Sequence, residues 1–427
     1  MFSVVLVAQD AAPPPSVWRT GSGHFVRAIE VEGSRAVGLS VVWPFAANAD
    51  SGAQRGLAYA LSQQRAANAD AVLPTGTSTQ RELGAGFTVF SVLLPPASTE
   101  LAGPWLQALL QPFDATAIDA AARTLAIAAL LADDSDWLYP GDVLRGRARR
   151  AIWKGTEHAT GVLGDAAALQ QFDAAAFVNA SAEPLASPLR VAVVGDVGVV
   201  DRLESLLAKV PCGPAARVDE TVGPTSFQAA SIELSPHPRT DAAYVAVAFA
   251  SPRPKASTLA TTVVIELLRS RARASFRSWR GNEPLARAPF VHADFLLGEP
   301  LVLLFRRAPT EAGPDLPRRE LADLLTSFTS VPPRETELAS ALGIVCAELS
   351  VPPYSDLQVK ALQRVPFGLL PRARVACLLG HFGIGDADVH ALSGLDINGI
   401  STSAKALLDG AEWWGGLLPT VKSPFGG

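Results

Sequence analysis

GAQRGLAYALSQQR, residues Gly52 to Arg65, is the stretch of sequence that decides the fold. The segment from Gly56 to Ala69 is rich in Ala and Leu and ends before a turn, which predicts a helix. Within this helix Tyr59 and Gln63 are four residues apart, so they share one face. The polar side chains on that face raise the question of which site, if any, the helix carries.

The composition indicates a large two-domain protein that does not bind nucleic acid. A chain of 427 residues exceeds the usual size of one domain, so two domains of about 200 residues are expected. Hydrophobic residues make up 48% of the chain, enough for large cores, and charged residues only 18%, which hints at a surface covered by a partner. The net charge of −5 excludes the basic surface typical of nucleic-acid-binding proteins.

Neither the N-terminus nor any later segment predicts a membrane span. The opening MFSVVLVAQDAAPPPS lacks the basic residues and the length of a signal peptide, and no run of about 18 apolar residues follows. We therefore expect a cytoplasmic protein, with export to the periplasm through a truncated signal as the alternative. The cysteines are too few and too widely spaced for a disulfide framework or a CxxC metal site: Cys212, Cys346 and Cys377.

The two halves of the chain repeat a similar order of strands and helices, which indicates a structural duplication. A Gly- and Pro-containing linker at 217–228 separates a predicted domain at 1–216 from a second at 229–427. We expect the Trp413–Trp414 pair to lie in a terminal helix that packs onto its own domain. Apolar periodicity and turn residues predict strands at 36–46, 86–95, 190–195, 231–236, 242–252 and 301–309, and helices at 56–69, 99–113, 115–134, 197–210 and 258–276.

Three segments in order carry a resemblance to a known family. Gly56-Leu57-Ala58-Tyr59-Ala60-Leu61-Ser62-Gln63 falls position by position on the signature G-L-A-H-x-x-E-H. Residues 75–79 resemble the N-A-x-T segment that follows it, and residues 191–197 resemble the strand and turn that close the first domain. The sequence thus resembles the insulinase/pitrilysin-like zinc peptidases (inverzincins), specifically non-catalytic members similar to processing-peptidase partner subunits and cytochrome-complex core proteins. The resemblance implies an α+β fold of two related α/β-sandwich domains, each a mixed sheet covered by helices, in a duplicated clamshell.

The family's catalytic groups are absent from the matching positions. In H-x-x-E-H two imidazoles bind Zn²⁺ and the glutamate is the general base for the zinc-bound water. Tyr59, Ser62 and Gln63 stand there instead; a protonated phenol and an amide are poor zinc ligands, and a hydroxyl cannot act as that base. The third family ligand, a glutamate, aligns with Ala128 or Ala129, which have no ligand atom. No two of the six histidines lie at i and i+4, so we expect no metal site in this chain.

Substrate binding is half preserved in the second half. Family members carry an Arg and a Tyr there that bind the substrate backbone; Arg269 matches the arginine, while Phe276 replaces the tyrosine. A guanidinium can bind carbonyl or carboxylate oxygens through two parallel hydrogen bonds, which suits the binding of a substrate backbone. The alternative is that the basic run from Arg269 to Arg280 is a solvated surface beside a helix end.

The resemblance implies a catalytically inactive subunit of a heteromeric zinc peptidase. The chain would complete the chamber of a homologous zinc-bearing partner, as a heterodimer or higher oligomer, and help hold its peptide substrate. Zinc is expected in the partner and no cofactor in this chain. Two alternatives stay open: a scaffold or core subunit of a larger assembly, and a stand-alone peptide-binding protein.

Overall fold

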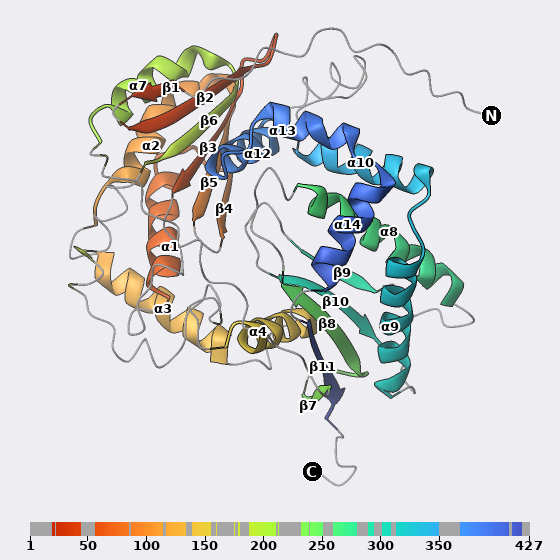
Figure 1. The fold of residues 1–427 in the computed structure, drawn as a ribbon. Helices are drawn as coiled ribbons and strands as arrows, with labels where there is room; N and C mark the ends of the chain where they lie inside the picture. The colour runs from red at the N-terminus through yellow and green to blue at the C-terminus, as the bar shows by residue number, and fades with distance from the viewer. Residues whose placement is uncertain are drawn as a thin grey trace.

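Two mixed β-sheets, one from each half of the chain, organise the computed structural model, with helices around both (Figure 1). In the described residues the first sheet has six strands in the order β1-β2-β6-β3-β5-β4, and the second has five in the order β7-β11-β8-β10-β9. The pairs β2–β6 and β7–β11 are parallel and all other pairs are antiparallel. The structure describes residues 19–21, 23–43, 56–84, 87–113, 117–133, 139–154, 159, 175, 178–179, 188–210, 212, 232–238, 240–250, 259–279, 289–293, 301–308, 313–349, 368–409 and 412–420.

In the first half, β3, β5, β6, α1, α2, α3 and α7 lie close to the predicted ranges, whereas β1, β2, β4 and α4 were not predicted. The strands are β1 (Arg19–Gly21), β2 (His24–Glu30), β3 (Val37–Trp43), β4 (Ser78–Leu83), β5 (Thr88–Leu94) and β6 (Arg190–Gly195). The helices are α1 (Leu57–Asp70), the 3-10 turn η3 (Pro96–Leu101), α2 (Ala102–Leu110), α3 (Ala117–Asp133), α4 (Pro140–Ile152), the 3-10 turn η6 (Val197–Val199) and α7 (Val200–Leu207).

The second half repeats the pattern with its own sheet and helical layer. Its strands are β7 (Glu233–His237), β8 (Tyr244–Ala250), β9 (Phe290–His292), β10 (Leu301–Arg307) and β11 (Glu412–Pro419). Its helices are α8 (Ala260–Trp279), α9 (Asp315–Ser330), α10 (Glu335–Leu349), α12 (Leu369–His381), α13 (Asp386–Ala391), the 3-10 turn η9 (Leu392–Gly394) and α14 (Ile397–Leu408).

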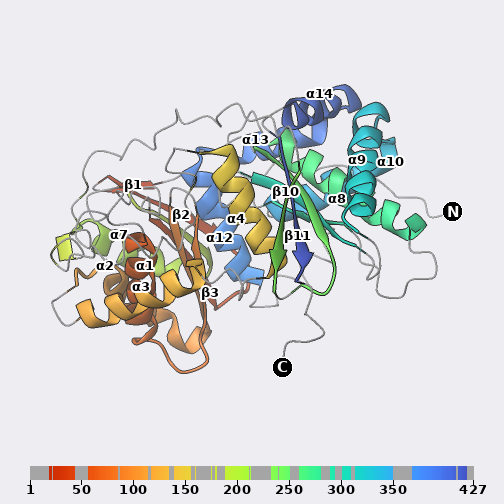
Figure 2. The same ribbon diagram turned by 90° about the horizontal axis from the view of Figure 1, so that it is seen from below.

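The two halves exchange one helix each. Helices α2 and α7 cover one face of the first sheet, and α12, from the second half of the chain, covers the other face through Ala376, Cys377 and Leu378. The second sheet is covered on one face by α8, α9 and α14, with α10 packed on α8, and on the other face by α4 from the first half. Figures 1 and 2 show α12 against the first sheet and α4 against the second. The central strands therefore have both faces buried, which explains why they read as continuous apolar runs.

Polar contacts also connect the halves. Arg27 on β2 donates to both carboxylate oxygens of Asp386 on α13, at 2.8 and 3.0 Å. Arg374 on α12 pairs with Glu82 on β4. The linker predicted at 217–228 lies outside the described residues, and the domain boundaries stay a prediction.

The segment after β6 turns as its sequence predicts. Gly195 has a positive φ of 116°, and a Cβ atom there would lie 2.2 Å from the carbonyl oxygen of Ala36. Only glycine fits both constraints. Asp196 then accepts a hydrogen bond from the Gly198 amide at 2.9 Å, which caps the turn leading into α7.

The expectation of a terminal helix at Trp413–Trp414 is wrong, because both residues lie in strand β11 between β7 and β8. Trp413 is 1% exposed and packs on the face that α4 covers, while Trp414 packs on the opposite face. A Cβ at Gly415 would lie 2.1 Å from the Trp413 ring, so the glycine makes room for the indole. A strand buried on both faces has no alternation to reveal it in the sequence.

Candidate functional site

The glycine that precedes helix α1 sets where the helix begins, and its apolar face sets its orientation. Gly56 precedes the helix with a φ of 96°, a left-handed conformation that favours glycine. Leu57, Ala60 and Leu61 are buried in a cluster with residues of α3 and with Phe113, which follows α2. The opposite face, which carries Tyr59, Ser62 and Gln63, is thereby directed toward strand β4.

Tyr59, Ser62 and Gln63, the residues predicted to stand at the family's ligand and base positions, are joined by hydrogen bonds, and Ser62 also bonds an arginine. Gln63 Nε2 donates to Tyr59 Oη at 3.0 Å, so the two residues share one helical face as the sequence predicts. Ser62 Oγ donates to the Tyr59 carbonyl at 2.8 Å and accepts a hydrogen bond from Arg81 Nη1 at 2.6 Å. The Arg81 guanidinium carbon also lies 5.1 Å from the centre of the Tyr59 ring, a cation–π distance.

Arg81 places a positive charge beside Tyr59, Ser62 and Gln63, on the face of α1 that the sequence alignment predicts as the former metal site. Burial lowers the pKa of Arg81, and Tyr59 opposes that shift. Arginine nevertheless keeps its proton in proteins. We refer below to Tyr59, Ser62, Gln63 and Arg81 as the α1–β4 polar cluster.

The α1–β4 polar cluster does not fit zinc. A phenol, a hydroxyl and an amide offer no thiolate, imidazole or carboxylate ligand. The guanidinium would repel a divalent cation placed beside it. Ala128 and Ala129 lie on helix α3, but their side chains are outside the described residues. Across the part of the chain that the structure describes, no group of three or more His, Cys, Asp or Glu side chains could hold a metal ion.

The two substrate-binding candidates lie on α8, which packs against β9, α9, α10 and α14 in the second half and apart from α1 (Figure 1). Arg269 donates to the Ala293 carbonyl at 2.9 Å and the Val291 carbonyl at 3.5 Å, and it pairs with Glu266 at 3.3 Å. These bonds tie α8 to strand β9. The Phe276 side chain lies outside the described residues, so a substrate-binding role for this pair stays a prediction.

Sequence reasoning missed Arg81, although a signal was present. Side chains two residues apart on a strand point the same way. Thr79 on β4 donates to Asp70 at the end of α1, so Arg81 is expected to face α1 as well. An arginine two residues beyond a helix-contacting position in an edge strand could have identified the cluster.

Arg65 was also missed, and it has a structural role behind the site. It is 3% exposed, donates to the Leu109 carbonyl at 2.6 Å and the Gln111 carbonyl at 3.2 Å, and lies 4.1 Å from the Trp43 ring centre. Burial lowers its pKa to about 9. The guanidinium satisfies carbonyls at the C-terminus of α2 and holds α1 against that helix.

None of the helices in the described part of the chain combines the length and the apolar run needed to cross a bilayer.

Comparison with known proteins places this geometry in a known fold. No family model and no curated protein matches the sequence. A protease from Helicobacter pylori has a similar structure, with a TM-score of 0.72 and 12% identity over 95% of this chain and 99% of that one. A peptidase M16 inactive domain from Pseudomonas fluorescens gives 0.67 and 17% over 96% and 98%. A chain of complex III2 from Candida albicans gives 0.68 and 12% over 95% and 96%.

These similarities extend over nearly the whole chain, and they show that it has the fold of the M16, or insulinase-like, peptidases. The α+β architecture expected from the three matching segments is thereby confirmed. The structures that share this fold include a protease, an inactive domain and a chain of a larger complex. The role of this chain among them has to be argued from its own residues.

Proposed function

We propose that this chain is a catalytically inactive subunit of a heteromeric zinc peptidase. It would complete the chamber of a homologous partner that carries an intact H-x-x-E-H motif, and help hold the peptide substrate there. The zinc would belong to the partner, and this chain would need no cofactor. The pair would act in the cytoplasm, or in the periplasm if the chain is exported.

The α1–β4 polar cluster is the observation that supports this proposal most. A helix that has lost its zinc ligands by drift needs no particular side chain in their place. Here Gln63 donates to the Tyr59 hydroxyl, Ser62 donates to the Tyr59 carbonyl, and Arg81 supplies a cation beside both Ser62 and Tyr59. The site is thus rebuilt as a stable polar surface without a metal or a general base, as expected of a chain that keeps the wall of a chamber but not its chemistry.

Holding a peptide is the less supported part of the proposal. Arg269 and Phe276 stay the candidates from family resemblance, and Arg269 already uses its guanidinium for β9 and Glu266. A direct substrate contact would have to replace one of these bonds.

A scaffold role is the second candidate, because a chain of complex III2 from Candida albicans shares the fold over 95% of this chain. A stand-alone peptide-binding protein is the third. Neither requires a zinc-bearing partner.

The test is a pull-down of the tagged full-length chain from its native host, with bound proteins identified by mass spectrometry and their ratio measured. A homologous chain carrying H-x-x-E-H at about one to one supports the proposal. A large assembly without such a chain favours the scaffold role, and the tagged chain alone favours the stand-alone role. A zinc-dependent peptidase activity that requires both chains would complete the case.

A further inference from the structure

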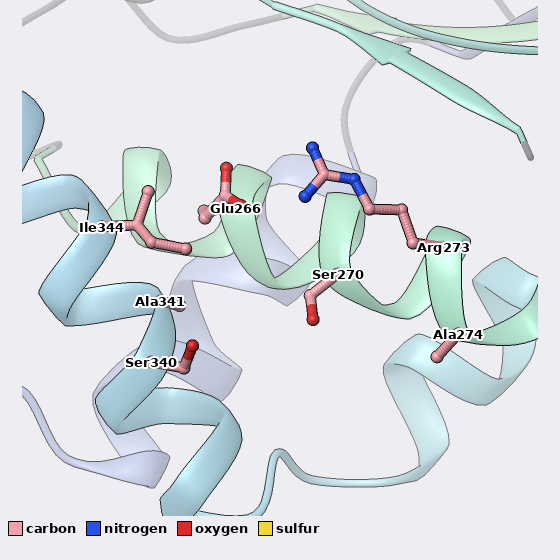
Figure 3. Close-up of a pocket in the computed structure, with 7 residues that line it drawn as sticks. All are labelled: Glu266, Ser270, Arg273, Ala274, Ser340, Ala341 and Ile344. Atoms are coloured by element: carbon pink, nitrogen blue, oxygen red, sulfur yellow. The ribbon is translucent and has the colours of Figure 1, made fainter.

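A pocket of about 270 Å³ lies between α8 and α10, away from the α1–β4 polar cluster. Along α8 its lining residues recur at intervals that keep them on one helical face. Figure 3 shows the guanidinium of Arg273 extending back along α8 toward Glu266, with the α10 residues opposite. The lining residues are Glu266, Ser270, Arg273, Ala274, Ser340, Ala341 and Ile344.

The two arginines on this side of α8 are used differently. Arg269 is bound to strand β9 and to Glu266. Arg273, one turn later, is exposed and makes no hydrogen bond or ion pair to any described residue. Its planar fork of donors is therefore available at the pocket, and such a fork binds a carboxylate through two parallel hydrogen bonds.

Glu266 adds a hydrogen-bond acceptor to the lining of the same pocket. The residue is 5% exposed, and its Oε2 is held by Arg269 at 3.3 Å. Its second oxygen, Oε1, accepts no hydrogen bond from the residues that the structure describes. Because the ion pair with Arg269 balances the charge of Glu266, the remaining charge at the pocket is the positive charge of Arg273.

The rest of the lining is small and partly apolar. Ser270 and Ser340 contribute hydroxyls, one from each helix. Ile344, which is 40% exposed, and Ala341 form an apolar wall on α10. The pocket thus offers a carboxylate-binding fork, a carboxylate acceptor, hydroxyls and an apolar surface together.

We propose that this pocket binds the C-terminal residue of a peptide. The free α-carboxylate would bind Arg273, and the N–H of the same residue would donate to Glu266 Oε1, since these two groups lie close together only at a chain end. The side chain would pack on Ala341 and Ile344. An interior peptide segment has no α-carboxylate at that place, so the site distinguishes the C-terminal end of a peptide from an interior segment.

The proposal goes beyond the proposed function and needs no zinc-bearing partner, because the single chain should bind by itself. The test uses the full-length chain and the peptide N-acetyl-Ala-Ala-Leu, compared with the same peptide as its C-terminal amide, by isothermal titration calorimetry. The free acid should bind at least ten-fold more tightly than the amide. Arg273→Gln should weaken binding of the free acid by a similar factor and abolish the difference between the two peptides.

Arg319→Gln is the matched control, since Arg319 is an exposed arginine on α9 outside the pocket, and it should leave both affinities unchanged. Ala274→Trp, which fills the exposed mouth of the pocket, should abolish binding of both peptides. Failure of the free acid to bind, equal affinity for acid and amide, or an unchanged difference in Arg273→Gln would each overturn the proposal. None of these results bears on whether a zinc-bearing partner exists.

Discussion

Restoring the family motif in this chain should fail to restore tight zinc binding as long as Arg81 is present. The perturbation is the triple variant Tyr59→His, Ser62→Glu and Gln63→His, compared with the same variant carrying Arg81→Ala in addition. The Arg81 guanidinium carbon lies 5.1 Å from the centre of the Tyr59 ring, so a zinc ion bound at that position would lie about as far from a positive charge.

The size of the effect follows from Coulomb's law. A charge of +2 and a charge of +1 about 5 Å apart repel each other by about 7 kcal/mol at an effective dielectric constant of about 20. That is an upper value of about 10⁵-fold in the dissociation constant, reduced to the extent that the guanidinium turns away. Arg81 would also pair with the carboxylate introduced at position 62, because it already bonds the Ser62 hydroxyl, and would weaken that carboxylate as a base.

The assay is competition for zinc against a chelating dye, with Arg123→Ala on the exposed face of α3 as the control substitution in the triple background. Removing Arg81 should tighten zinc binding by several orders of magnitude, and the control should not. Equal affinity with and without Arg81 would refute the reasoning. Neither variant should cleave peptide, because the third ligand position is predicted at Ala128 or Ala129. Cleavage would show that this alignment is wrong.

Three further predictions concern stability and reactivity. Burial, together with the charge of Arg190, lowers the pKa of His381 to about 4. The stability that His381 contributes is therefore complete above its ordinary pKa of 6.5 and is lost as the pH falls toward 4. In denaturant titrations, His381→Phe should remove about 3 kcal/mol of this acid-dependent loss of stability. Leu144→Ala on the exchanged helix α4 should lower the free energy of unfolding by about 3–5 kcal/mol and speed amide exchange in β8 and β10. The control is Ile127→Ala, at a side chain that is 58% exposed, which should change the free energy of unfolding by less than about 0.5 kcal/mol. Cys377, whose pKa burial raises to about 12, should react with iodoacetamide only after unfolding, as followed by mass spectrometry.

The sequence predicts the buried central strands and the faces of α1, but not the strand β11 or the helix α4, nor the sheets that α4 and α12 cover. Apolar periodicity predicts that a helix buries one face. It does not indicate which sheet that face covers. Leu144 and Cys377 are each fully buried against a sheet from the other half of the chain, a contact that only the tertiary fold creates. The Trp413–Trp414 error has the same origin, since a strand covered on both faces resembles a buried helix in its composition.

The α1–β4 polar cluster also bears on the choice between the chamber and scaffold roles. A dead site buried inside a scaffold would be most stable with apolar side chains, because each buried polar group needs a partner and leaving one unpaired costs about 1–3 kcal/mol. Tyr59 and Gln63 are instead only half-buried, and their polar atoms are bonded to each other at the surface of α1. Arg81 binds this surface from β4, one of the two edge strands of the first sheet in the described residues. A half-exposed polar surface with a fixed positive charge, beside an unpaired strand edge, suits a wall that still meets a peptide, and for that reason we rank the chamber role above the scaffold.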